Sequence, residues 1–211
     1  MPRLLLLALA CLVAGCGTPT PKPPPAASAS APPLFDDLGD LHRDIGTPVP
    51  AAQRYFDQGL RMAYGFNHEA ARRAFAEAER LDPRCAMCAW GQALVLGPNI
   101  NLPMDPLLAA QATELATRAV ALSANARPAD RALIEALQLR YTNPAPQDRA
   151  TLDAAYAEAM GKVVARFPGD DDAATLFAEA LMDLTPWAYW TAAGQQTTHR
   201  PRILAALERA L

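Results

Sequence analysis

The clearest pattern of apolar and polar residues along the chain predicts two short amphipathic helices, at about 52–65 and 68–81. Small residues recur at Gly59, Ala71 and Ala78, where two antiparallel backbones must approach closely. Large apolar side chains on both predicted helices can fill the gaps beside these small residues. We therefore predict a pair of antiparallel helices that pack closely along one face.

Similar helix pairs are predicted along the rest of the chain. Ala93 lies 34 residues after Gly59, again at the small position, and this spacing matches the tetratricopeptide repeat (TPR), a helix pair of about 34 residues. Further helices are predicted at about 128–141, 148–166, 171–184 and 201–211. Because one pair cannot bury its apolar faces alone, neighbouring pairs must stack. We predict an all-α, TPR-like helical-hairpin solenoid over 51–211, with about four pairs and the last incomplete.

The N-terminal residues predict export. Leu4–Ala14 is apolar, follows one positive charge and is too short to span a bilayer, so residues 1–15 are typical of a signal peptide. The sequence Leu-Val-Ala-Gly-Cys16 resembles the lipobox of bacterial lipoproteins. We interpret Cys16 as a lipidation site that anchors the protein in the cell envelope, and we expect the outer membrane and a periplasm-facing domain. The alternative is an ordinary signal peptide with a chance cysteine.

Two segments separate the predicted signal peptide from the first helix. Residues 16–34 are rich in Pro, Ala and Ser, lack apolar bulk and predict a disordered tether. Residues 35–50 predict an irregular lead-in, in which Leu38, Leu41 and Ile45 are placed to lie against the first helix. The rest of the chain is predicted to form the repeat domain.

Charge and cysteine content narrow the class of protein. The formal net charge is −3 and no basic stripe with interleaved aromatic residues is present, which argues against nucleic-acid binding. Of the four cysteines, only Cys85 and Cys88 lie outside the leader region, so we do not expect a disulfide framework. No motif for a catalytic nucleophile, a phosphate loop or a metalloprotease helix is visible, so we predict no cofactor and favour a non-enzymatic role.

Cys85-Ala-Met-Cys88 is the sharpest short motif in the chain. Haem attachment needs a histidine where Ala89 stands, and a thioredoxin-like site needs a strand pattern that is absent. A metal site needs further ligands, and His68, the closest histidine in sequence, is predicted at the far end of its helix, about 24 Å away. We favour a local disulfide or two buried thiols at a helix start, with a redox or metal role as the alternative.

The predicted loops differ in length in a regular way. Connections between helix pairs are short, whereas the loops within pairs, at 97–105, 142–147 and 185–200, are generally longer. In an antiparallel stack all loops of one kind emerge at the same edge, and insertions in repeat proteins often form the binding face. The candidate binding edge therefore gathers Asn67, His68, Asn99, Asn101, Asp105, Trp187 and Trp190.

Several of these side chains have two interpretations. Asn67 is placed to cap the second helix. His68 beside it is expected to be neutral, because a helix N-terminus disfavours a cation, and either binds a ligand or packs. Trp187 and Trp190 either stack on a ligand or cover the open end of the last pair. The helical methionines are predicted to fill the core: Met62, Met87, Met160 and Met182.

Three stretches of the sequence together resemble one protein family: YFDQGLRMAYGFNH, LDPRCAMCAWGQALVLGPNIN and LFAEALMDLTPW. They are similar to exported bacterial TPR proteins of a family that has no established activity, and the resemblance covers about 41–211. It implies a TPR fold and carries over no substrate or site residue. Members of that family continue past the equivalent of Leu211 with histidine-rich helices, which implies that this chain is truncated at its C-terminus.

These observations lead to two hypotheses of function. The first is a membrane-anchored TPR scaffold that binds a protein or peptide partner in the cell envelope. The second is a metal-handling or redox-linked TPR protein that uses His68 and loop residues together with a missing C-terminal half. The sequence does not name a metal-ligand set for the second hypothesis.

Overall fold

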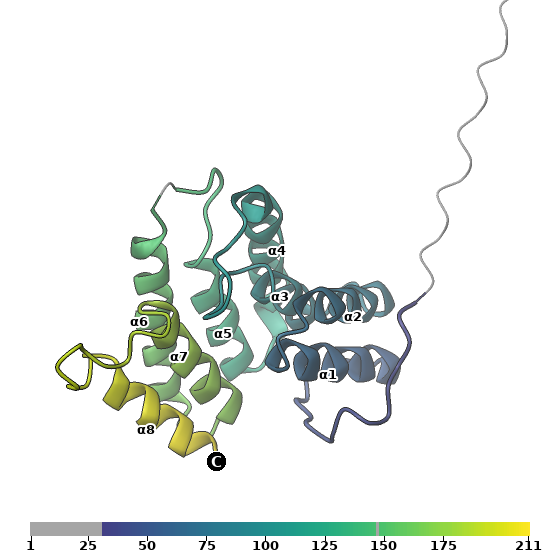
Figure 1. Cartoon of the computed structure of the whole chain (residues 1–211). Coiled ribbons are helices and arrows are strands. Elements are labelled where there is room, and N and C mark those ends of the chain that lie inside the picture. The colour runs from purple at the N-terminus through teal and green to yellow at the C-terminus, as the bar shows by residue number, and fades with distance from the viewer. Residues whose placement is uncertain (1–30, 147) are drawn as a thin grey trace, which may run out of the picture. The chain divides into compact units, whose positions relative to one another are not determined.

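The computed structural model describes residues 31–146 and 148–211 (Figure 1). Within these ranges the regular elements are eight α-helices and two short 3₁₀ helices, with no β-strand, so the predicted all-α class is confirmed. In chain order they are α1 (Pro50–Tyr64), α2 (His68–Leu81), α3 (Ala86–Leu94), η1 (Pro106–Leu108), α4 (Ala109–Leu122), η2 (Ser123–Asn125), α5 (Pro128–Gln138), α6 (Ala150–Arg166), α7 (Asp171–Asp183) and α8 (Arg200–Ala210).

Consecutive helices pack against one another along the described part of the chain. Helix α1 packs on α2, α3 on α4 and α7 on α8, and each helix also contacts the next one in sequence. Contacts between helices two apart, α1 with α3 and α3 with α5, bring successive pairs together. Figure 1 shows the resulting progression from α1 and α2, through the group α3 to α6, to α7 and α8. The buried apolar side chains of all these helices form one continuous core.

The seam between α1, α2 and α3 explains the small residues in the sequence. A Cβ atom built on Gly59 or on Gly91 would lie 2.6 Å from the ring of Phe75, closer than real Cβ contacts allow. The Phe75 ring, fully buried, therefore occupies the space that the two glycines leave on either side of α2. Ala71 and Ala78 are also fully buried in this seam.

The helix boundaries agree with the pattern of the sequence to within a few residues. Helix α2 begins and ends where the pattern predicts, and Pro128 occupies the first turn of α5. The helix predicted to reach Tyr141 ends instead at Gln138. The prediction that the Asn67 side chain caps α2 is wrong: it makes no capping hydrogen bond, because Asn67 (φ −90°, ψ 62°) lacks the extended backbone of a typical N-cap.

Residues 31–49 form no helix, yet side chains of α1 hold them in place. The Tyr55 hydroxyl donates to the Pro32 carbonyl at 3.0 Å, and the Gln58 amide donates to the Pro33 carbonyl at 2.9 Å. The last residues of the predicted tether are thus bound to α1. Ile45 packs against the core as expected, whereas Leu41 is exposed. The predicted signal peptide, the predicted lipidation site Cys16 and the predicted tether up to residue 30 lie outside the described residues.

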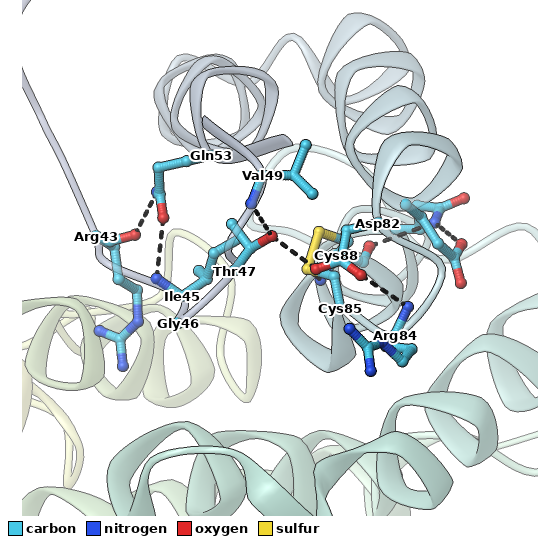
Figure 2. Close-up of a disulfide and its surroundings, with 12 residues drawn as sticks. Arg43, Ile45, Gly46, Thr47, Val49, Gln53, Asp82, Arg84, Cys85 and Cys88 are labelled. Carbon is cyan, nitrogen blue, oxygen red and sulfur yellow. Dashed lines mark hydrogen bonds between the residues drawn. A yellow bond between two sulfur atoms is a disulfide. The ribbon is translucent and has the colours of Figure 1, made fainter. Parts of the chain in front are cut away.

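Cys85 and Cys88 form a disulfide at the start of α3 (Figure 2). Both cysteines are buried, and the Cys85 sulfur also accepts a hydrogen bond from the Cys88 backbone N–H. Thr47 reaches this turn from the lead-in and donates to Asp82 at 2.6 Å. The disulfide therefore lies where α2, α3 and the lead-in meet.

The helical methionines contribute to the core, as predicted: Met62, Met87, Met160 and Met182. Met104, in the loop before α4, is buried as well, and its sulfur lies 3.1 Å from Arg149 Nη1. Among the described residues, no helix combines the length and the apolar character that crossing a bilayer requires.

Candidate functional site

An open pocket of about 480 Å³ lies between the α1–α2 turn and the loop from α3 to α4. It brings together five of the seven residues of the predicted binding edge: Asn67, His68, Asn99, Asn101 and Asp105. Phe66, Glu69 and Arg72 from the α1–α2 region also line it. The pocket therefore combines one aromatic ring, neutral amides and an imidazole with charges of both signs.

The two tryptophans of the predicted edge do not line this pocket. Trp187 and Trp190 are 68% and 55% exposed, in the loop between α7 and α8. The Arg200 guanidinium lies over the Trp190 ring, 4.1 Å from its centroid. Tyr189 between them packs against the core. The long α7–α8 loop thus contributes one core residue and two exposed rings, separate from the pocket.

Two polar side chains of the pocket organise its loop. Asn99 Oδ1 accepts hydrogen bonds from the backbone N–H groups of Asn101 and Leu102, at 2.9 and 3.1 Å. Asp105 Oδ1 accepts from the Leu107 N–H at 2.9 Å and thereby caps the short helix η1. Asn99 and Asp105 are therefore occupied in shaping the wall of the pocket.

His68 is the first residue of α2, and its imidazole lines the pocket. Burial lowers the pKa of His68, and the nearby positive charge of Arg140 lowers it further, against a hydrogen bond with the Ala63 backbone that raises it. These effects favour the neutral ring that the sequence predicts, with burial as the main cause. Its Nδ1 lies 3.4 Å from Asn99 Nδ2. A neutral imidazole has one donor and one acceptor nitrogen, and this ring directs them to the Ala63 backbone and to Asn99.

Phe66 forms the rim of the pocket and was not among the residues predicted from the sequence. Its φ of 58° lies in the left-handed region, which costs a non-glycine residue free energy. The side chain is 50% exposed and stacks on His68, with ring centroids 6.0 Å apart. This backbone conformation ends helix α1, because the Phe66 N–H donates to the Ala63 carbonyl at 3.0 Å and the Asn67 N–H donates to the Met62 carbonyl at 2.8 Å. The exposed ring beside the pocket is a candidate ligand contact.

Arg140 holds the loop from α3 to α4, which forms part of the pocket wall. Its Nη2 donates to the Pro98 carbonyl at 3.0 Å and to Asp183 Oδ2 at 2.5 Å, and its guanidinium lies over the Tyr156 ring. A Cβ on Gly97 would lie 2.6 Å from the Tyr141 hydroxyl and 3.0 Å from Arg140 Nη1. The loop can pass this close only because residue 97 is glycine.

The charges around Arg140 are unusual for a protein interior. Burial raises the pKa of Asp183 to about 7, although the Arg140 charge opposes this rise. Burial also raises the pKa of Glu179, again against Arg140. Arg140 Nε and Asp183 Oδ1 are buried without a hydrogen-bond partner. The pocket loop is thus fixed to a buried charged cluster whose hydrogen bonds are incomplete.

The structure places His68 and the cysteine pair at opposite ends of α2. His68 begins α2, whereas Cys85 and Cys88 follow its other end. Among residues 31–146 and 148–211, no group of three or more His, Cys, Asp or Glu side chains is arranged to hold a metal ion. Comparisons of the chain with protein families, curated proteins and solved structures find no match.

Proposed function

We propose that this chain is a TPR-like helical scaffold of the cell envelope, anchored to a membrane through a lipid on Cys16, that binds a protein or peptide partner. The partner contacts the pocket that Phe66, His68 and the α3–α4 loop form. The observation that carries this proposal is the exposed Phe66 ring beside an open pocket with polar walls.

The packing of the first helices supports the TPR-like part of the proposal. Phe75 of α2 inserts between Gly59 of α1 and Gly91 of α3, as a close seam between neighbouring helix pairs requires. Each described helix packs on its sequence neighbour, and α1, α3 and α5 contact one another in order. Stacked helix pairs are a common support for binding surfaces made of loops and helix ends.

The chemistry of the pocket suits a peptide segment. Phe66 offers a flat apolar surface for a partner's apolar side chain, and Asn67 and Asn101 offer donors and acceptors for its backbone amides. Glu69 and Arg72, which pair with each other on α2, leave the rim close to neutral in charge. Such a surface favours a ligand with mixed apolar and polar groups over a strongly charged one.

A peptide-display experiment tests the binding surface. Short random peptides displayed on phage are selected on the immobilised full-length chain, and the affinities of the selected peptides are measured by fluorescence anisotropy. Phe66→Ala is expected to weaken binding by about tenfold or more, because it removes the central aromatic contact. Leu207→Ala, which changes a partly exposed apolar residue of α8 outside the pocket, serves as the matched control. Equal affinities for both variants would contradict the proposed surface.

The lipid anchor is tested separately. Cells that express the full-length chain are grown with radioactive palmitate, and the immunoprecipitated protein is expected to carry the label. The Cys16→Ala variant is expected to lose the label and to leave the membrane fraction. Label that remains on the variant would contradict lipidation at Cys16.

A further inference from the structure

Side chains of α1 hold the segment 32–47, here called the strap, mainly through its backbone. Gln58 uses both ends of its amide: Oε1 accepts from the Phe35 N–H at 2.8 Å, and Nε2 donates to the Pro33 carbonyl at 2.9 Å. Arg61 Nε donates to the Leu41 carbonyl at 2.8 Å. This arrangement resembles the way a binding protein holds an extended peptide, since the backbone is recognised whatever its side chains.

The same recognition continues at the centre of the strap. Gln53 again uses both amide atoms, donating to the Arg43 carbonyl at 2.8 Å and accepting from the Ile45 N–H at 3.1 Å. Asp57 accepts from the Arg43 N–H at 3.2 Å and contacts His42 Nδ1 at 2.8 Å. Figure 2 shows Gln53 reaching both Arg43 and Ile45. Side chains of α1 therefore hold the strap at several points between Pro33 and Ile45.

Arg43 anchors the strap in an acidic site between α5 and α7. Its five guanidinium hydrogen bonds run to three carboxylates: Nε and Nη2 to Asp130, Nη1 and Nη2 to Asp170, and Nη1 to Asp172, at 2.7 to 3.2 Å. Asp170 receives two parallel bonds, the arrangement that distinguishes a guanidinium from an ammonium group. An ammonium group cannot supply these two parallel bonds, so the geometry fits arginine better than lysine.

The acidic site depends on the charge that the strap supplies. Asp130, Asp170 and Asp172 contribute three carboxylates, and besides Arg43 the neighbouring Arg127 pairs with Asp130. Asp130 is almost completely buried. Burial alone would raise the pKa of Asp170, but hydrogen bonds from Arg43 hold it below its ordinary value. If the strap leaves, the three carboxylates lose the positive charge and the hydrogen bonds of Arg43. The empty site therefore favours another guanidinium.

We propose that the strap is an intramolecular ligand, and that the α1 face together with Asp130, Asp170 and Asp172 is a binding site for an extended peptide carrying arginine. The chain occupies this site with its own residues 32–47. An arginine-bearing peptide binds when the strap is released, and it competes with the strap for the same contacts. This site is separate from the Phe66 pocket, and it goes beyond the partner binding proposed there.

The first experiment tests whether the strap is a ligand that can leave a folded domain. A specific protease site is inserted after Gly46 in the full-length chain, because Gly46 is exposed and has open space around it. After cleavage, the N-terminal fragment is expected to stay bound during gel filtration at low salt and to dissociate at high salt, as charge pairs are screened. Circular dichroism checks that the remaining domain keeps its helices.

The second experiment tests the ligand class on the cleaved domain, from which the fragment has been removed at high salt. A fluorescent peptide with the sequence of residues 32–46 is expected to bind it and to bind the uncleaved chain far more weakly. The Arg43→Ala peptide is expected to bind about 30-fold more weakly or worse, because buried carboxylates lose their partner. The Asp40→Ala peptide, changed at an exposed position, is the matched control and is expected to bind as the unchanged sequence does.

Each remaining outcome overturns the proposal. Loss of the fragment at low salt immediately after cleavage would show that the strap is not a ligand of the domain. Equal binding of the Arg43→Ala and unchanged peptides would show that the acidic site does not select arginine. Unfolding of the domain on removal of the fragment would show that the strap is part of the fold instead of a separable ligand.

Discussion

Arg43 and Arg140 are two almost fully buried arginines, exposed by only 8% and 2%, and their surroundings differ sharply. All five hydrogen bonds of the Arg43 guanidinium end on carboxylates at the N-terminal ends of α5 and α7. Arg140 pairs with a single carboxylate, Asp183, donates to one carbonyl and lies over one ring, while its Nε has no partner.

The difference separates a complete ionic site from an incomplete one. At Arg43 every N–H donor of the guanidinium has a carboxylate partner, and Asp170 and Asp172 keep some exposure to water. The Arg140 site lies deeper, and its parts cannot reach water without disturbing the core. Arg43 therefore suits a separable strap, whereas Arg140 fixes the shape of the pocket loop.

The largest expected effect comes from breaking the Arg140 pair. Arg140→Ala leaves Asp183 buried without its partner and is expected to lower the free energy of unfolding by about 3–5 kcal/mol. Urea unfolding followed by circular dichroism measures this change. The double variant Arg140→Met, Asp183→Leu removes both charges and is expected to be close to wild type in stability. A double variant as unstable as the single one would contradict the ion-pair explanation.

Removing the Arg43 side chain is expected to have a smaller effect. Arg43→Ala should lower the free energy of unfolding by about 2–3 kcal/mol, because Asp170 and Asp172 lie near the surface and can be rehydrated. Arg43→Lys should recover part of the loss, since an ammonium cannot reproduce the two parallel bonds to Asp170. The same urea titrations measure both variants. If Arg43→Ala lowers the free energy of unfolding more than Arg140→Ala does, the expected order of the two sites is wrong.

Phe66 allows a test of strain at the pocket rim. Phe66→Gly is expected to raise the free energy of unfolding by about 1 kcal/mol, because glycine tolerates a positive φ, and to abolish binding of peptides selected on the pocket. Trp187→Gly is the matched control, since Trp187 has a similar φ of 62° outside the pocket. The control should gain similar stability and keep peptide binding. Equal loss of binding in both variants would argue against a role for the rim.

The smallest expected effect concerns the protonation of His68. NMR titration should place the pKa of His68 below its ordinary value of 6.5, because burial and Arg140 disfavour the cation. The neutral ring then contributes stability above pH 6.5 that is lost as the pH falls through the lower folded-state pKa. The stability difference between wild type and His68→Gln should therefore narrow in acid. A pKa at or above 6.5 would contradict this description of the pocket.

The positions of the helices follow from the sequence because each depends on neighbouring residues. Apolar periodicity, small residues at Gly59 and Ala78 and the proline at position 128 are local signals, and the structure keeps all of them. The sequence also predicts the loop from α3 to α4, because its prolines prevent a continuous helix. Its polar residues Asn99 and Asp105 were correctly placed beside His68.

Tertiary structure alone decided which distant groups meet. Arg43 lies 87 residues from Asp130 and 129 from Asp172, and no local pattern marks such a pair. The strap appeared as an irregular segment because its contacts are backbone hydrogen bonds to α1, which impose no apolar period. Trp187 and Trp190 were assigned to the pocket edge from loop order, but loop order does not fix the path of a long loop. The sequence therefore determined the helices, whereas packing determined the ionic sites, because charge pairing acts through space.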